Sequence, residues 1–381
     1  MMLPPACALA GLHELPPLED LPALLAAPRG RLDLAPPVAP PWQPFATFRQ
    51  GSAPMALGRM PQRFGNALRL GVYTDAVILG GGAVVDSAEG RMVVESFASA
   101  SDSGLAVPQR LEGALSLLSL RLENGKIHPR RPWRRPARRI AGPLLHLTYR
   151  PDLNYTHFML EVLPRLHHWL LFPEPRPRLL VSEHVAARLA PLLALYGVRP
   201  DQLVPVGGPG APPVVAERLY LGSAPLWKHE APLQALRGAA DRFPDGKRRI
   251  RIQRRDAKLW FRNLLNEAEV AALLDGLGFE SVALEDFSLS EQVALFRSAD
   301  CVAGVYGGGL FNTLFCRAGT RVLSLTSPDY HRFVLDSLPP PLALRGATVV
   351  GESFTMKLDT NNSPFVVDME AVRAACAALA L

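Results

Sequence analysis

The chain has no long continuous apolar run, and its N-terminus lacks the basic region and apolar core of a signal peptide. The first absence argues against a membrane-spanning helix, and the second argues against secretion. Met1 to Gly11 is therefore not interpreted as a targeting segment. We expect the protein to reside in the cytoplasm.

Cysteine is also scarce, and Cys7, Cys301, Cys316 and Cys376 include no closely spaced CxxC pair. A disulfide framework or a cysteine-based metal site needs such spacing. The four residues are interpreted as small, buried hydrophobic side chains in a reducing compartment.

Apolar residues are plentiful, at 48% of the chain. The length of 381 residues is enough for two domains of ordinary size. Prolines crowd the first 44 residues and disfavour long helices there. We expect residues 1–65 to be largely irregular, residues 66–235 to form an N-terminal α/β lobe, and residues 236–381 to form a C-terminal lobe.

The net charge of +6 is concentrated in a basic segment that contains no acidic residue. Its cations are Lys126, Arg130, Arg131, Arg134, Arg135, Arg138 and Arg139. One interpretation is a contact with anionic lipid, acidic polysaccharide or nucleic acid, and the other is a solvated connector. The chain has no recognisable nucleic-acid-binding module, so no nucleic-acid partner is expected.

The two expected lobes differ in their local sequence patterns. Short apolar runs separated by glycines between Leu70 and Leu122 predict hairpin-like strands, and strand–helix alternation begins at Leu144. The second half alternates more regularly, which predicts a doubly wound parallel sheet. Its expected strands are Arg249 to Gln253, Phe279 to Ala283, Cys301 to Val305 and Val322 to Leu325; its expected helices are Glu267 to Leu277 and Ser290 to Ser298. Asn266 and Ser288 are the expected helix caps.

A run of three glycines, Gly307, Gly308 and Gly309, follows the expected strand at Cys301 to Val305 and precedes a helix that begins near Leu310. Free N–H groups at such a junction can bind phosphate, although an ordinary glycine turn is an equally good interpretation. Arg254 follows another strand, and Arg262 comes soon after it. Their guanidinium groups are suited to a pyrophosphate.

The other candidate site is a helical pattern in which His157 and Glu161 stand four residues apart. A carboxylate one turn away can orient an imidazole and raise its basicity. The pair could remove a proton from a sugar hydroxyl, with Asn154 and Arg165 beside it. The alternative is a satisfied core histidine.

The run Asn154-Tyr155-x-His157-x-x-x-Glu161-x-Leu163-Pro164-Arg165 resembles the N-Y-x-H-W-x-x-E-x-L-P-R signature of glycosyltransferase family 61. The second half also resembles that family. Arg254, Arg262 and Asn266-Glu267 match its arginine and N-E positions, Glu291-Gln292 falls in the segment before the glycine loop, and Ala299 to Phe315 with Ala318-Gly319-Thr320 follows its glycine loop and P-G-T stretch.

The resemblance implies an α/β fold of GT-B type, with two Rossmann-like lobes and a cleft between them. It also implies inverting, metal-independent transfer from a nucleotide-sugar, with a UDP-sugar as the expected donor, and no other cofactor. The implied acceptor is a polysaccharide or lipid-linked glycan of the bacterial capsule or exopolysaccharide kind, bound by the N-terminal lobe. Contact of Arg130 to Arg139 with the inner membrane face would suit a lipid-linked acceptor.

The resemblance also assigns roles. His157, assisted by Glu161, is the candidate base, although the division of work between them stays open. The candidate donor-binding residues are Arg254, Arg262, Tyr306, Gly307, Gly308, Gly309, Asn312 and Gln292. Asn154 and Arg165 are the candidate acceptor or cleft residues.

Three departures from the family pattern matter. Tyr306 stands where the family has the histidine of its H-G-A-G loop, and a tyrosine carries no positive charge near neutral pH. Gln253 and Phe158 replace a serine and a tryptophan. The second functional hypothesis is therefore a degenerate transferase fold that binds nucleotide or glycan without turnover. A nucleotide-dependent oxidoreductase is disfavoured because no G-x-G-x-x-G spacing is present in the right place.

Overall fold

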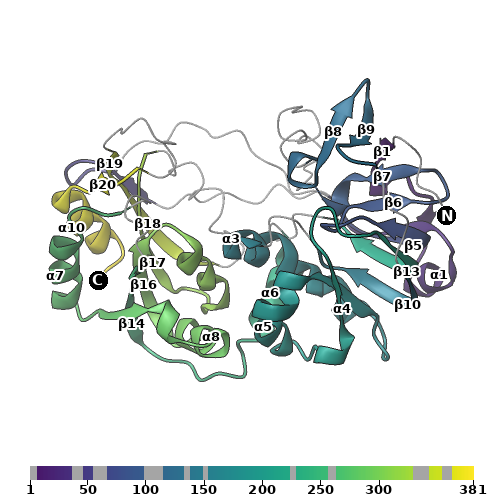
Figure 1. Cartoon of the computed structure of the whole chain (residues 1–381). Coiled ribbons are helices and arrows are strands. Elements are labelled where there is room, and N and C mark those ends of the chain that lie inside the picture. The colour runs from purple at the N-terminus through teal and green to yellow at the C-terminus, as the bar shows by residue number, and fades with distance from the viewer. Residues whose placement is uncertain are drawn as a thin grey trace. The chain divides into compact units, whose positions relative to one another are not determined.

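The computed structural model describes residues 7–36, 46–54, 67–97, 115–132, 138–148, 153–223, 229–255, 263–328, 343–353 and 363–381. The chain divides into two compact units, each containing both helices and strands (Figure 1). Unit 1 comprises Met1–Ala39 and Arg63–Leu236, and unit 2 comprises Pro40–Gln62 and Arg237–Leu381. The predicted α/β class is confirmed.

Unit 1 is built on a mixed sheet in the order β1-β7-β6-β5-β13-β10-β11-β12, with β3 on β5 and β2 on β3. Its strands are β1 Ala8–Ala10, β2 Pro17–Leu18, β3 Gly30–Ala35, β5 Leu68–Ile78, β6 Val84–Asp86, β7 Arg91–Val93, β10 Arg138–His146, β11 Arg178–Ser182, β12 Leu203–Val206 and β13 Val214–Gly222. A separate hairpin is formed by β8 Leu120–Glu123 and β9 Lys126–Pro129.

The two halves of this sheet differ in strand direction. β13, β10, β11 and β12 run parallel, as the alternation from Leu144 onward predicts. β5 runs antiparallel to β13 and to β6, and β6 runs antiparallel to β7, which confirms the predicted hairpin-like region. Unit 1 is therefore only partly parallel.

The helices of unit 1 are α1 Leu21–Ala26, α3 Tyr155–His157, α4 Leu166–Leu171, α5 Ala190–Ala194 and α6 Glu230–Gly238. Its 3₁₀ and π turns are η1 Leu12–Glu14, η2 Val94–Ser96, η5 Phe158–Val162, η6 Leu163–Arg165, η7 Val185–Leu189 and η8 Pro200–Gln202. In the part of the chain that the structure describes, every helix is too short or too polar for a membrane span.

The prediction that residues 1–65 are largely irregular is wrong for Ala8 to Ala35. Two prolines occupy positions that tolerate them, Pro17 in a two-residue strand and Pro22 in the first turn of α1, where Asp20 caps the helix. β4 Ala46–Phe48 also belongs to a sheet, because it pairs in parallel with β18 of unit 2.

Unit 2 is built on a fully parallel sheet in the order β15-β14-β16-β17-β18-β4, as the sequence predicts for its first four strands. The remaining strands are β14 Arg248–Gln253, β15 Glu280–Ala283, β16 Ala299–Val305, β17 Arg321–Thr326 and β18 Arg345–Val350, with β19 Glu352–Ser353 paired to β20 Phe365–Val366. The helices are α7 Glu267–Gly276, α8 Leu289–Arg297 and α10 Met369–Ala378, with shorter turns η10 Leu284–Asp286 and η11 Gly308–Phe315.

Alternate residues of the strands define the two faces of this sheet. Ala303, Leu323 and Val349 pack with Leu274 of α7 and Ala375 of α10 in one core cluster. On β14, the side chain of Arg251 bonds Glu267 at the start of α7, so its neighbour Ile252 faces the other side of the sheet. α7 and α10 therefore cover one face, and η11 packs on the other, where a Cβ on Gly309 would lie 3.4 Å from Ile252 Cγ2.

The strand order of unit 2 reverses at β14. The chain passes from β14 to β15 on one side and then to β16 on the other side of β14. In open parallel sheets, ligands bind at the carboxyl ends of the strands that flank such a reversal. The carboxyl ends of β14 and β16 are thus the edge of unit 2 best suited to a ligand.

Candidate functional site

In unit 1, the segment that begins at Asn154 is one helical run with mixed hydrogen bonding. The Asn154 side chain caps it by accepting the N–H of Thr156 at 2.9 Å. A π-helical turn, η5, follows the three residues of α3, and the 3₁₀ turn η6 contains Pro164, which cannot donate a helical hydrogen bond. The predicted helix is confirmed, and π turns of this kind are frequent at functional sites.

His157 and Glu161 meet within this run. The distance from His157 Nδ1 to Glu161 Oε2 is 2.8 Å, and the two side chains are 46% and 13% exposed. The hydrogen bond that His157 donates to Glu161 raises the pKa of His157 against the opposing effect of partial burial. Because Nδ1–H donates to the carboxylate, Nε2 is the ring nitrogen that can accept a proton. The predicted pairing is confirmed.

The two residues predicted to flank this pair have different surroundings. Asn154 is exposed and uses its side-chain oxygen as the helix cap. Arg165 is only 1% exposed, and its guanidinium donates to the backbone oxygen of Glu95 at 3.3 Å. Arg165 is thus buried within unit 1, and its role as an acceptor or cleft residue stays a prediction.

In unit 2, the glycine run forms the turn between β16 and η11. Gly307 has an extended backbone, and the following helix is 3₁₀ rather than α and begins at Gly308, two residues before the predicted start. A Cβ on Gly309 would lie 2.9 Å from Leu284 Cδ1 and 3.4 Å from Ile252 Cγ2. The turn therefore packs closely on the side chains of Ile252 in β14 and Leu284 in η10, and a side chain at 309 would require Leu284 to move.

Tyr306, the residue before the glycines, is 5% exposed. Its backbone N–H donates to Leu325 O at 2.8 Å, and its ring makes an edge contact with Phe311 at 5.7 Å between centroids. The turn is thus fixed on one side by β17 and on the other by η11.

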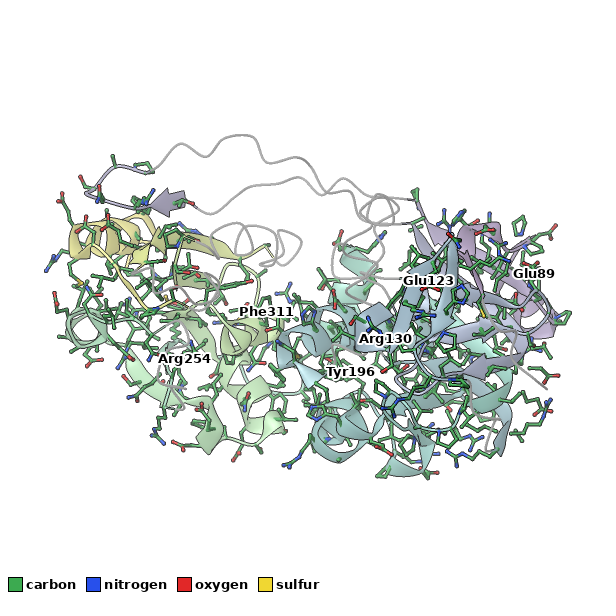
Figure 2. All side chains as sticks on the ribbon, turned by 45° about the horizontal axis from the view of Figure 1, so that its top comes forward. Glu89, Glu123, Arg130, Tyr196, Arg254 and Phe311 are labelled. Carbon is green, nitrogen blue, oxygen red and sulfur yellow. The ribbon has the colours of Figure 1, made fainter. Side chains whose placement is uncertain are left out.

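Arg254 is the first residue after β14 and is half-buried, whereas its neighbour Arg255 is exposed and forms an ion pair with Asp286 at 2.6 Å. Because β14 and β16 are adjacent and parallel, Arg254 and the glycine turn lie at the same edge of the sheet. Figure 2 labels Arg254 and, in η11, Phe311. Arg262 lies outside the described residues.

Two more of the predicted donor-binding residues contact each other. Asn312 Nδ2 donates to Gln292 Oε1 at 3.0 Å, which joins η11 to α8. Asn312 is fully buried and Gln292 is half-buried. Sequence reasoning missed Leu284 and Ile252, the residues against which the turn packs, because their apolar side chains carry no chemical signal.

The basic segment is only partly described, since residues 133–137 lie outside the described ranges. Arg130 and Arg131 are exposed at the end of the β8–β9 hairpin, where Figure 2 labels Arg130. Arg138 bonds Pro205 O at 3.4 Å, and Arg139 forms an ion pair with Asp75. Arg130 likewise bonds a backbone oxygen, that of Leu120 at 3.4 Å, so the contact of Arg139 with Asp75 differs from these two in pairing opposite charges.

All four cysteines are buried and free, as predicted. Burial raises the pKa of Cys7 to about 11 and that of Cys301 to about 12, which disfavours their reactive thiolate form. Over the described ranges, histidine, cysteine and carboxylate side chains form no group of three that could hold a metal ion.

Two comparisons with known proteins bear on these sites. Residues 155–323 match the family model described as Glycosyltransferase 61. The match includes His157, Glu161, Arg254 and the glycine turn. No curated protein matches the chain.

Proposed function

Because residues 155–323 belong to glycosyltransferase family 61, we propose that the chain is an inverting, metal-independent glycosyltransferase. It moves a sugar from a nucleotide-sugar, with a UDP-sugar as the expected donor, to a polysaccharide or lipid-linked glycan. We further propose a GT-B-like architecture in which the two units are its lobes. The observation that carries the proposal is the reversal of strand order between β14 and β16, with Arg254 and the glycine turn at that edge.

The donor diphosphate is assigned to this edge of unit 2. The first N–H groups of a helix have no partner within the helix, so the start of η11 at Gly308 and Gly309 can donate to phosphate oxygens. The guanidinium of Arg254 can bind the same group and neutralise the charge that grows as the nucleoside diphosphate leaves. Arg262 is proposed as a second cation.

The acceptor is assigned to unit 1. His157 Nε2 removes the proton of an acceptor hydroxyl, while Glu161 holds the ring and stabilises the imidazolium that forms. The acceptor oxygen then forms a bond to the anomeric carbon, and the bond from that carbon to the diphosphate oxygen breaks. Attack opposite the leaving group inverts the anomeric configuration.

A thermal-shift screen against UDP, GDP, CDP, CMP and ADP, with and without magnesium, tests the donor site. A ligand that binds only the native state raises the unfolding temperature. We expect one nucleotide to stabilise the protein without metal and Arg254→Ala to abolish that shift. Arg255→Ala is the matched control, because Arg255 is adjacent but exposed and paired with Asp286. Stabilisation that appears only with magnesium would contradict the metal-independent mechanism.

For the basic segment, we propose peripheral contact with anionic lipid on the cytoplasmic membrane face. The exposed Arg130 and Arg131 support it, since each cation near such a surface adds about 1 kcal/mol of attraction. Co-sedimentation with vesicles containing phosphatidylserine tests this contact. Binding that is equal for neutral vesicles, or unchanged in the Arg130→Ala/Arg131→Ala variant, would contradict it.

A further inference from the structure

The side chain of Gln292 is fully engaged within unit 2. From the second turn of α8, its Nε2 donates to Leu284 O at 3.0 Å and to Phe287 O at 3.2 Å. Its Oε1 accepts from Asn312 Nδ2 at 3.0 Å. Both carbonyls can only accept, so the amide orientation is determined by its partners. Gln292 therefore has no N–H left for a bound nucleotide.

These contacts act on one side of η11. A 3₁₀ helix has three residues per turn, so Gly309 and Asn312 are aligned on the same side. Gly309 packs on the side chain of Leu284, and Asn312 bonds Gln292, which in turn bonds the carbonyl of Leu284. The glycine turn is thus joined to η10 by an apolar contact and a hydrogen-bonded chain.

The start of α8, from which Gln292 projects, is held in place by a capping box. Ser288 caps α8 by accepting the N–H of Glu291, and the Glu291 side chain accepts the N–H of Ser288 at 2.8 Å. This capping box fixes the start of α8, and the Gln292 backbone N–H bonds Ser288 O at 2.9 Å. Gln292 consequently projects from a helix end whose position is defined.

We propose that Gln292 is a positioning residue for the donor site, which acts through Asn312 to hold the glycine turn in the orientation that binds the diphosphate. The inference rests on the proposed function, and it replaces the expectation that Gln292 contacts the donor. Groups that bind a developing charge must be held to within a fraction of an ångström, so a loosened turn weakens binding even though no ligand contact is removed.

The test is isothermal titration with whichever of UDP, GDP, CDP, CMP and ADP most stabilises the wild-type chain. Gln292→Met keeps the length of the side chain and removes its three hydrogen bonds, and we expect its Kd to rise about tenfold. Glu285→Gln is the matched control, because Glu285 is exposed on η10 and its Kd should stay within about twofold of wild type, the ordinary effect of a surface change.

A double-mutant cycle with Asn312→Ser separates positioning from a general loss of stability. If the two residues act through one contact, the double variant should bind no more weakly than the weaker single variant. Additive effects on Kd, or an unchanged Kd in Gln292→Met alongside a lower unfolding temperature, would overturn the proposal. A wild-type chain that binds none of the five nucleotides would overturn the proposed function and this inference together.

Discussion

His157 Nδ1 lies 2.8 Å from Glu161 Oε2 across one turn of the helical segment in unit 1. The contact sets the tautomer of the imidazole and raises its pKa, with the hydrogen bond as the larger cause and burial opposing it. Both effects suit a base that acts on a sugar hydroxyl, because a higher pKa favours proton transfer to the ring.

The first prediction concerns pH. A general base must be neutral, so transfer should fall as the pH drops through the raised pKa of His157, above the ordinary imidazole value of about 6.5. Glu161→Gln replaces the carboxylate whose hydrogen bond and charge raise this pKa, and it should move the acidic limb of the kcat profile to lower pH. His157→Ala should lower kcat by about 10²- to 10⁴-fold, the usual contribution of such a group. An acidic limb that does not move in Glu161→Gln would argue against His157 as the base.

A second prediction follows from two buried histidines that have the opposite pKa shift. Burial, with the charge of Arg165 nearby, lowers the pKa of His146 and that of His168 to about 3. Both stay neutral when folded but bind protons when unfolded below about pH 6.5, so stability should decrease as the pH falls from there toward 3.

From pH 7 to pH 5 the expected loss is about 2 kcal/mol for each histidine. Urea unfolding at the two pH values measures it. His146→Gln keeps an N–H group for the bond to Gly82 O but does not titrate, so the pH-dependent loss should be roughly halved. An equal loss in wild type and His146→Gln would show that other groups control acid stability.

The third prediction uses two glycines of unit 1. A Cβ on Gly222 would lie 2.5 Å from the buried ring of His168, whereas a Cβ on Gly208 would meet no atom within 4 Å. Gly222→Ala should destabilise the protein by about 1–3 kcal/mol, because a well-packed interior resists added volume. Gly208→Ala should change the free energy of unfolding by less than about 1 kcal/mol. Equal urea midpoints for the two variants would contradict the packing around His168.

The fold was predictable where the signal is local. The alternation of unit 2 and the capping box at Ser288 and Glu291 depend on near neighbours, and both are confirmed. Asn266 occupies the N-cap position of α7 as predicted, but its side chain makes no capping bond and instead forms two hydrogen bonds to the backbone of Val367. Val367 is 101 residues away in the chain, so the spacing of residues in the helix could not show that it would take the place of the capping bond.

The site was predictable in the same uneven way. The pairing of His157 with Glu161 follows from four-residue spacing, whereas Arg165 is buried where its guanidinium bonds Glu95, a residue 70 positions away in the chain. The proximity of Arg254 to the glycine turn required the strand order, which no local pattern encodes. The sequence also could not show that the Gln292 amide is hydrogen-bonded within unit 2, because its partners Leu284 and Asn312 come from two separate turns.

The last prediction distinguishes an active transferase from a degenerate one, and it concerns Tyr306. The ring is nearly buried against Phe311, and a tyrosine supplies no positive charge to a leaving diphosphate. Tyr306→His introduces an imidazole whose protonated form supplies that positive charge. The ratio of its transfer rate to that of wild type should therefore be higher at pH 6 than at pH 8. Tyr306→Phe keeps the ring but cannot gain charge, and it should show no such pH-dependent gain. Transfer assays with the nucleotide-sugar chosen by the binding screen measure the difference.

A rise confined to Tyr306→His would identify a weakened enzyme, because only an otherwise complete site can use the added charge. Nucleotide binding without turnover in all three proteins would favour the degenerate fold, since restoring one cation would then not have restored the reaction.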